Sequence, residues 1–153
     1  MLSKDLLDFF SALNESETRY LIVGGMAVVA YGVDRTTGDI DIWLSNDEAN
    51  LNSLEKALLH LQFEPIEINA AIDAYRHKGK LTMVLDIKFP LELLPLFSSF
   101  TTFEDAYQKR RDIEFSGVLL KVVDLDTLMD MKIRAGREKD FWDVNQLKKK
   151  QKE

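Results

Sequence analysis

The chain has no cysteine, only two histidines and three prolines, and no long apolar run. Without cysteine it can form neither a disulfide framework nor a thiolate metal site, and a reducing compartment is permitted. No apolar stretch approaches the roughly 18 to 20 residues of a membrane span. Residues 1–10 carry Lys4, Asp5 and Asp8 within their apolar pattern, which is unlike a signal peptide. We therefore expect a cytoplasmic protein that does not contact a membrane.

Positive charge is also scarce in this chain, which has 20 basic and 26 acidic side chains and a net charge of -6. Such a molecule is not steered as a whole onto polyanions, although a local basic patch could contact one. The length of 153 residues and the hydrophobic content of 46% are sufficient for one globular core. We predict a single domain over residues 1–147, followed by a basic, solvated tail over residues 148–153.

The apolar pattern predicts alternating helices and strands, and hence an α/β protein. Helices are expected over residues 3–14, 26–32, 46–61, 102–110, 125–134 and 138–146. Strands are expected over residues 19–25, 39–43, 72–77, 81–89 and 117–123, with a hairpin turn at 78–80. Residues 90–102 contain two prolines and two adjacent serines, so we expect them to form a loop over the core.

Two aspartates share one face of an expected strand in the segment "DIDIW", residues 39–43. Asp39 and Asp41 are two positions apart, so their side chains stand about 7 Å from each other on the same side. Their repulsion is unfavourable unless water or a cation lies between them. Magnesium prefers such carboxylate oxygens. The pair is therefore either half of a metal site or two solvated charges on an exposed edge strand.

The glycine pair Gly24-Gly25 ends the apolar run that precedes these aspartates. Backbone amides at a glycine turn that opens a helix can approach a phosphate closely. Taken alone, such a pair more often marks a tight turn without any ligand. The order of glycine pair, short helix, "RTTG" and Asp-Ile-Asp-Ile resembles the signature of the DNA polymerase β-like nucleotidyltransferase superfamily.

This resemblance implies a small mixed β-sheet with helices packed mainly on one side. It also implies two magnesium or manganese ions, held by Asp39, Asp41 and a third carboxylate on a neighbouring strand. Asp86 in "VLDIKF" matches that third position, because its alternation with apolar neighbours points it away from the apolar face. The chain departs from the pattern at Gly25, where many members have a serine hydroxyl, which leaves only backbone amides for the phosphates.

A second segment, "LMDMKIRAGREKDFWDV" at residues 128–144, is similar to a helix pair of minimal nucleotidyltransferases that include the type IV abortive-infection toxins. The resemblance implies that solvated Lys132, Arg137 and Lys139 bind a triphosphate. Asp140 would cap a helix or orient a lysine. The alternative is a solvated helix pair in which Asp140 and Asp143 form internal salt bridges. Arg35 and Thr36 reach the phosphates or stabilise their loop.

The implied activity is metal-dependent transfer of a nucleoside monophosphate from ATP or another nucleoside triphosphate, with release of pyrophosphate. The acceptor stays open between RNA, a protein and a small molecule. A toxin role, with an antitoxin as partner, is one form of this activity. The alternative is a catalytically inactive, nucleotide-binding regulator or subunit of the same fold.

Overall fold

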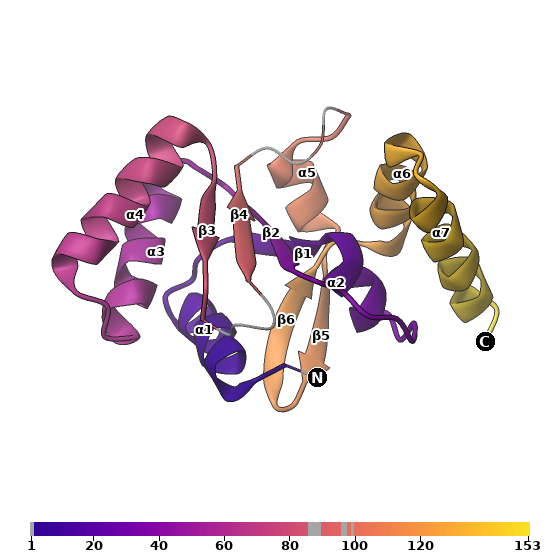
Figure 1. Cartoon of the computed structure of the whole chain (residues 1–153), viewed down its shortest axis with the longest axis horizontal. Coiled ribbons are helices and arrows are strands. Elements are labelled where there is room, and N and C mark those ends of the chain that lie inside the picture. The colour runs from indigo at the N-terminus through magenta and orange to yellow at the C-terminus, as the bar shows by residue number, and fades with distance from the viewer. Residues whose placement is uncertain (1, 86–89, 96–97, 99) are drawn as a thin grey trace.

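The computed structural model describes residues 2–85, 90–95, 98 and 100–153, which form a mixed α/β structure (Figure 1). Its helices are α1 (Lys4–Glu15), α2 (Gly24–Ala30), α3 (Glu48–His60), α4 (Pro65–Lys78), α5 (Phe103–Gln108), α6 (Leu125–Ala135) and α7 (Glu138–Gln151). Its strands are β1 (Tyr20–Val23), β2 (Ile40–Leu44), β3 (Leu81–Met83), β4 (Leu91–Leu94), β5 (Arg111–Phe115) and β6 (Val118–Val122). Within these ranges, every helix is too short or too polar to cross a membrane.

The strands form one sheet in the order β3-β4-β2-β1-β6-β5. The central pair β1 and β2 is antiparallel, whereas β1 pairs with β6 and β2 pairs with β4 in parallel. Antiparallel hairpins of β3 with β4 and of β5 with β6 complete the two edges. The expected α/β class with a small mixed sheet is therefore confirmed.

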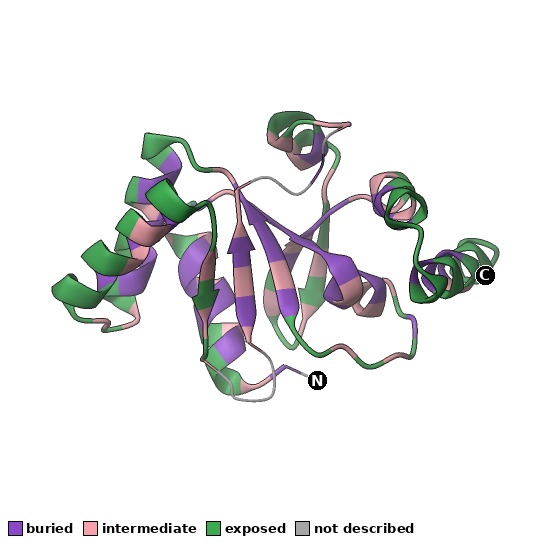
Figure 2. Cartoon of the chain, turned by 45° about the horizontal axis from the view of Figure 1, so that its top comes forward, coloured by how far each residue is buried: buried purple, intermediate pink, exposed green. Residues whose placement is uncertain are grey.

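The centre of the sheet is buried from both faces, as Figure 2 shows for the strands at the middle of the molecule. Phe10 of α1 packs against Tyr20, with ring centroids 5.7 Å apart, and Phe103 of α5 packs against Trp43 at 5.5 Å. Because Leu21 pairs with Trp43 and follows Tyr20, Tyr20 and Trp43 point to opposite faces. Helices α1, α3 and α4 lie side by side in one layer, and α5 covers the other face.

Polar caps explain where several helices begin and end. At the start of α1, α3, α5 and α6, a backbone N–H of the first turn donates a hydrogen bond to the side-chain oxygen of the capping residue. The capping residues are Ser3, Asp47, Thr102 and Asp124. At the other end, Gly136 stops α6 in the left-handed conformation, with φ of 68°. This turn brings the start of α7 back beside the end of α6, which matters for the site.

The segment 72–77, for which we predicted a strand, belongs to α4. It alternates when read alone, but the helix starts upstream at Pro65 and buries apolar side chains at helical spacing: Ile68, Ile72 and Tyr75. Gly79 caps this helix with φ of 75°, so residues 78–80 are not a hairpin turn. The hairpin prediction was wrong because helical periodicity over fourteen residues outweighs a short alternation.

The loop prediction for residues 90–102 was also wrong in part, because Leu91–Leu94 form β4. Pro90 and Pro95 flank this strand without interrupting it, so they mark its ends. Of the predicted strand 81–89, the structure shows β3 as far as Met83, while residues 86–89 lie outside the described residues. Helix α7 continues beyond the predicted end at residue 146 to Gln151 and includes the exposed lysines 148–150.

Candidate active site

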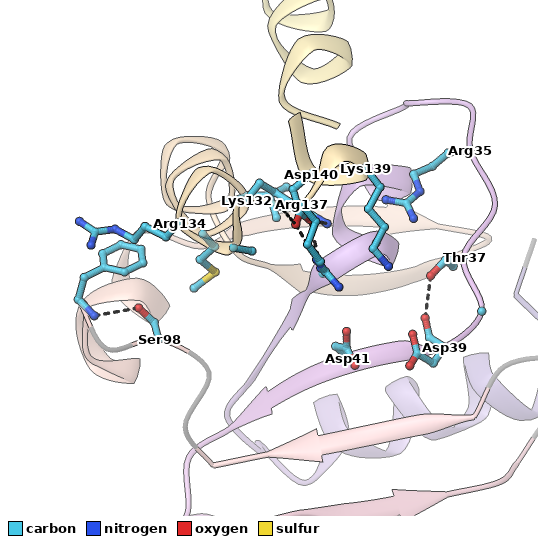
Figure 3. Close-up of a pocket in the computed structure, with 17 residues that line it drawn as sticks. Arg35, Thr37, Asp39, Asp41, Ser98, Lys132, Arg134, Arg137, Lys139 and Asp140 are labelled. Carbon is cyan, nitrogen blue, oxygen red and sulfur yellow. Dashed lines mark hydrogen bonds and ion pairs between the residues drawn. The ribbon is translucent and has the colours of Figure 1, made fainter. Parts of the chain in front are cut away.

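A cavity of about 460 Å³ lies where β1 ends, where β2 begins and where α6 meets α7 (Figure 3). Its volume is typical of small-molecule sites. Its lining includes five cations and three carboxylates: Arg35, Lys132, Arg134, Arg137, Lys139, Asp39, Asp41 and Asp140. In a protein with net charge -6, this is a local reversal of sign. The cavity is therefore suited to an anionic ligand.

The carboxylates of Asp39 and Asp41 lie on the β2 side of the cavity, facing the cations across it (Figure 3). Asp39 is exposed just before β2, and Asp41 is half-buried in the strand. Burial, followed by the charges of Asp39 and Glu92, raises the pKa of Asp41 to about 6. Within the described part of the chain, neither aspartate forms an ion pair. The predicted carboxylate pair is thus brought together, and Lys132 and Arg137 offset its repulsion only in part.

Gly24 is the first residue after β1 and lies against the Asp41 carboxylate. Its φ is 67°, and a Cβ built there would stand 2.6 Å from Oδ2 of Asp41. Any other residue would be strained and would displace the carboxylate. The expected glycine turn is therefore shaped by close approach to Asp41, the second residue of β2, although the two glycines open α2 rather than precede it.

Gly25 lies close to side chains of the loop before β2. A Cβ at this position would lie 2.8 Å from Oγ1 of Thr37 and 3.2 Å from Nη2 of Arg35. A serine, as in the resembling pattern, would therefore require these two side chains to shift.

Lys132, from α6, is buried between two aspartates of α7. Its Nζ lies 2.9 Å from Asp143 and 3.4 Å from Asp140, and only 7% of the lysine is exposed. Asp143 also accepts a 2.6 Å hydrogen bond from Nη1 of Arg35, a residue 108 positions away. The expectation that Lys132 is solvated was wrong, because the α6–α7 turn presses it onto both carboxylates.

Asp140 performs both of the roles left open for it. Its carboxylate accepts hydrogen bonds from the backbone N–H of Arg137 at 3.1 Å and from Nε of Arg137 at 2.7 Å, and the first of these satisfies a free N–H at the start of α7. It also pairs with Lys132. Burial alone would raise the pKa of Asp140, but the bonds from Arg137 and the charge of Lys132 lower it overall. Asp140 is fully buried, so it reaches a ligand only through the cations it holds.

Lys139 and Arg134 are the exposed cations of the cavity for which no ion pair is formed within the described residues. Figure 3 shows Lys139 extending toward the loop that carries Thr37. Thr37 lines the cavity and donates a 2.9 Å hydrogen bond to the backbone oxygen of Asp39. Thr36, the predicted neighbour, lines a different hollow beside Met26. The sequence did not distinguish Thr37 from Thr36, because the two adjacent threonines fit the pattern equally well.

The predicted third carboxylate, Asp86, lies outside the described residues. A different carboxylate, Glu92 of β4, pairs in register with Asp41 and therefore faces the same side of the sheet. Its Oε1 accepts a 3.1 Å hydrogen bond from Thr82, and Lys80 lies 3.9 Å from Oε2. Its signal in the sequence was the alternation "LELL", which the loop prediction hid.

Glu92 does not close a three-carboxylate cluster with the aspartates as the side chains stand. Among the described residues, no group of three histidine, cysteine or acidic side chains is arranged to hold a metal ion. The structure therefore provides a carboxylate pair with a third acidic residue in the adjacent strand.

Comparison with protein families identifies the group to which this site belongs. The model of the family described as "Nucleotidyl transferase of unknown function (DUF2204)" matches residues 2–153. The chain belongs to this nucleotidyl transferase family. The crystal structure of a "putative nucleotidyltransferase" from Thermotoga maritima matches with a TM-score of 0.58 and 14% identity, over 92% of this chain and 88% of that one. At this identity the likeness shows the fold. No curated protein is significantly similar to the chain.

For this nucleotidyl transferase family member, one cavity joins the two motifs singled out in the sequence. The glycine pair, Asp39 and Asp41 line its β-sheet side, and Lys132, Arg137, Lys139 and Asp140 line its helical side. The family assignment extends to nucleotidyl transfer in general and does not single out the toxin relatives.

Proposed function

We propose that this nucleotidyl transferase transfers a nucleoside monophosphate from a nucleoside triphosphate to an acceptor hydroxyl or phosphate, with release of pyrophosphate. The observation that supports it most strongly is the two-sided cavity. A carboxylate pair without ion pairs in the described residues faces five cations, of which Arg35, Lys132 and Arg137 are bonded to aspartates of α7. A triphosphate with its metal ions carries the complementary arrangement of charges.

The carboxylates are suited to magnesium or manganese, because all their donor atoms are hard oxygens. Burial and the charges of Asp39 and Glu92 raise the pKa of Asp41 more than Lys132 and Arg137 lower it, and a divalent cation would offset that cost. Asp39 and Asp41 would hold two ions, with Asp86 or Glu92 as the third carboxylate. Two bound ions would activate the acceptor oxygen and stabilise the leaving pyrophosphate.

The remaining residues of the cavity bind and orient the triphosphate in this proposal. Lys139 and Arg137 supply donors for the phosphate oxygens. Gly24 and Gly25 let backbone amides approach them, since no side chain stands in the way. Lys132 acts through its fixed charge from within the α6–α7 network. Catalysis would then be chiefly a matter of positioning and electrostatic stabilisation.

The deciding experiment is incubation of the purified protein with each of the four α-labelled nucleoside triphosphates and magnesium or manganese. Total RNA, a protein extract and the protein itself serve as acceptors. We expect the parent to label one acceptor. The double variant that carries Asp39→Asn and Asp41→Asn should label none. If the parent binds nucleotide but labels no acceptor, the proposed transferase activity is wrong and the role of a nucleotide-binding regulator is favoured. Labelling that persists in the double variant would refute the assigned site.

The third carboxylate is tested by calorimetric titration with manganese and by turnover, comparing Glu92→Gln with Asp86→Asn. The variant at the true third position should lose turnover roughly a hundredfold or more while still binding nucleotide. The other variant serves as its matched control. Equal turnover in both would remove the third carboxylate from the proposal.

A further inference from the structure

The cavity has two chemically different ends. In Figure 3, Arg35 and Thr37 lie at one side, Arg134 and Ser98 lie at the other, and Asp41 lies between them. Phe100 and the apolar side chains of Leu128 and Met131, from the same helix as Arg134, also line the cavity. A triphosphate bound by the carboxylates and the α7 cations would use the charged end and the middle. The apolar end is left for another part of the ligand.

The side chains of Arg134 and Phe100 form the wall of the cavity at the Arg134 end. The Cζ atom of Arg134 lies 4.2 Å from the ring centroid of Phe100, which is cation–π distance. The backbone N–H of Phe100 donates a 3.2 Å hydrogen bond to Oγ of Ser98, which also lines the cavity. Phe100 is half-buried and Arg134 is exposed. Both planar groups therefore border the cavity.

Arg134 is not committed to a carboxylate, because within the described residues it forms no ion pair. Phosphate binding would not need a phenylalanine, whereas a guanidinium layered on an aromatic ring is a platform on which other flat rings stack. Leu128 and Met131 add an apolar floor, and methionine adapts to the shape of its neighbours. Planar, apolar and cationic surfaces together favour an aromatic heterocycle.

We infer that the end of the cavity formed by Phe100, Arg134 and Met131 is the nucleobase subsite of the nucleoside triphosphate. This inference rests on the proposed function and extends it by assigning the part of the substrate that the metal and the cations do not hold. Stacking recognises the flat face of a base, so the subsite accepts any base and discriminates by ring size more than by hydrogen bonding.

The test compares two ligands that share the triphosphate but differ in the base. Dissociation constants for ATP and for inorganic tripolyphosphate are measured by calorimetry in the presence of manganese, in the parent and in Phe100→Ala. We expect ATP to bind the variant roughly tenfold more weakly, while tripolyphosphate changes by less than about twofold. Phe100→Trp should retain ATP binding, because it keeps an aromatic face.

Two further variants keep the result interpretable. Phe100→Leu fills the same space without an aromatic ring, so it should keep the fold, as judged by thermal unfolding, and still lose ATP affinity. Phe141→Ala is the matched control, because Phe141 is an exposed phenylalanine of α7 that does not line the cavity. It should leave both dissociation constants unchanged.

The inference is overturned if Phe100→Leu and Phe100→Ala weaken both ligands equally, or if they weaken neither. It is also overturned if the parent binds ATP no more tightly than tripolyphosphate. If the parent still labels an acceptor, any of these results contradicts the base subsite but not the proposed transferase activity. A parent that binds neither ligand contradicts the proposed function itself, and the subsite with it.

Discussion

Two pairs of aspartates, one lining the cavity and one in the helix beside it, have opposite surroundings. Asp140 and Asp143, on α7, are buried and bonded to Lys132, Arg137 and Arg35. Asp39 and Asp41 stand at the start of β2 without an ion pair in the described part of the chain. The same chemical group is thus bonded to cations on one side and, among the described residues, stands without an ion pair on the other. Neighbours, and not residue type, decide which aspartates are available to a metal ion.

The aspartates of α7 also keep the nearby cations from pairing with Asp39 and Asp41. Lys132 and Arg137 lie close enough to lower the pKa of Asp41 in part, but burial and the nearby carboxylates outweigh them. Each cation is already bonded on its own side of the cavity, so it does not cross to neutralise Asp41. The cavity therefore keeps charges of both signs, which a triphosphate with metal ions requires.

The strongest way to break the comparison is Asp143→Asn. This change leaves buried Lys132 and half-buried Arg35 short of a carboxylate, and removing one partner of a buried pair costs about 3–5 kcal/mol. We expect the free energy of unfolding in urea to fall by this amount. Asp39→Asn, the control from the exposed pair, should change it by less than about 0.5 kcal/mol. Equal losses in both variants would mean that the two pairs do not differ.

A second change acts on the contact between the glycine turn and the strand pair. Gly24→Ala forces a side chain onto Oδ2 of Asp41 at a positive φ, which should cost about 1–3 kcal/mol and weaken manganese binding. Gly38→Ala is the control, because a Cβ there meets nothing within 4 Å. Unfolding in urea and calorimetry with manganese measure both effects. Tight manganese binding by Gly24→Ala would place the metal away from Asp41.

A third prediction concerns the pH dependence of the strand pair. The folded pKa of Asp41 is about 6, above its ordinary value of 3.8, so between these values the native protein binds more protons than the unfolded chain. Asp41 therefore lowers the stability of the metal-free parent as pH rises through this window. With EDTA at pH 7.5, Asp41→Asn should melt higher by about 2–4 °C, equivalent to roughly 1 kcal/mol.

The advantage of Asp41→Asn should disappear near pH 4, where the parent is also uncharged at this position. Manganese should raise the melting temperature of the parent and leave the variant unchanged, which reverses their order at pH 7.5. Thermal unfolding at both pH values measures this. A variant less stable than the metal-free parent at pH 7.5 would contradict the electrostatic account.

The smallest effect is expected for Lys139→Ala. Lys139 is exposed, so its loss should leave the free energy of unfolding within about 0.5 kcal/mol of the parent. Its loss should weaken ATP and tripolyphosphate alike, by roughly fivefold, because it removes one charged donor from the phosphates. Lys148→Ala, an exposed lysine later in α7, is the control. If both lysines affect binding equally, Lys139 contributes only general charge.

Local pattern was sufficient to predict the parts of the site that lie within one motif. The alternation "DIDI" placed Asp39 and Asp41 on one face, and the glycine pair marked the end of β1. Gly136 marked the end of α6, which sets the α6–α7 turn. These features depend on backbone geometry within a few residues, so sequence periodicity reports them directly.

Only the tertiary structure decided which charged residues lie next to one another. Arg35 meets Asp143 across 108 positions, Lys132 is buried by α7, and Glu92 comes beside Asp41 through the parallel pairing of β2 with β4. A charged residue looks the same in a sequence whether it is solvated or paired, because burial is set by which elements pack together. The sequence by itself determined which charges this protein carries and in which local elements they stand. Packing between distant segments determined which of those charges neutralise one another and which are left for a ligand.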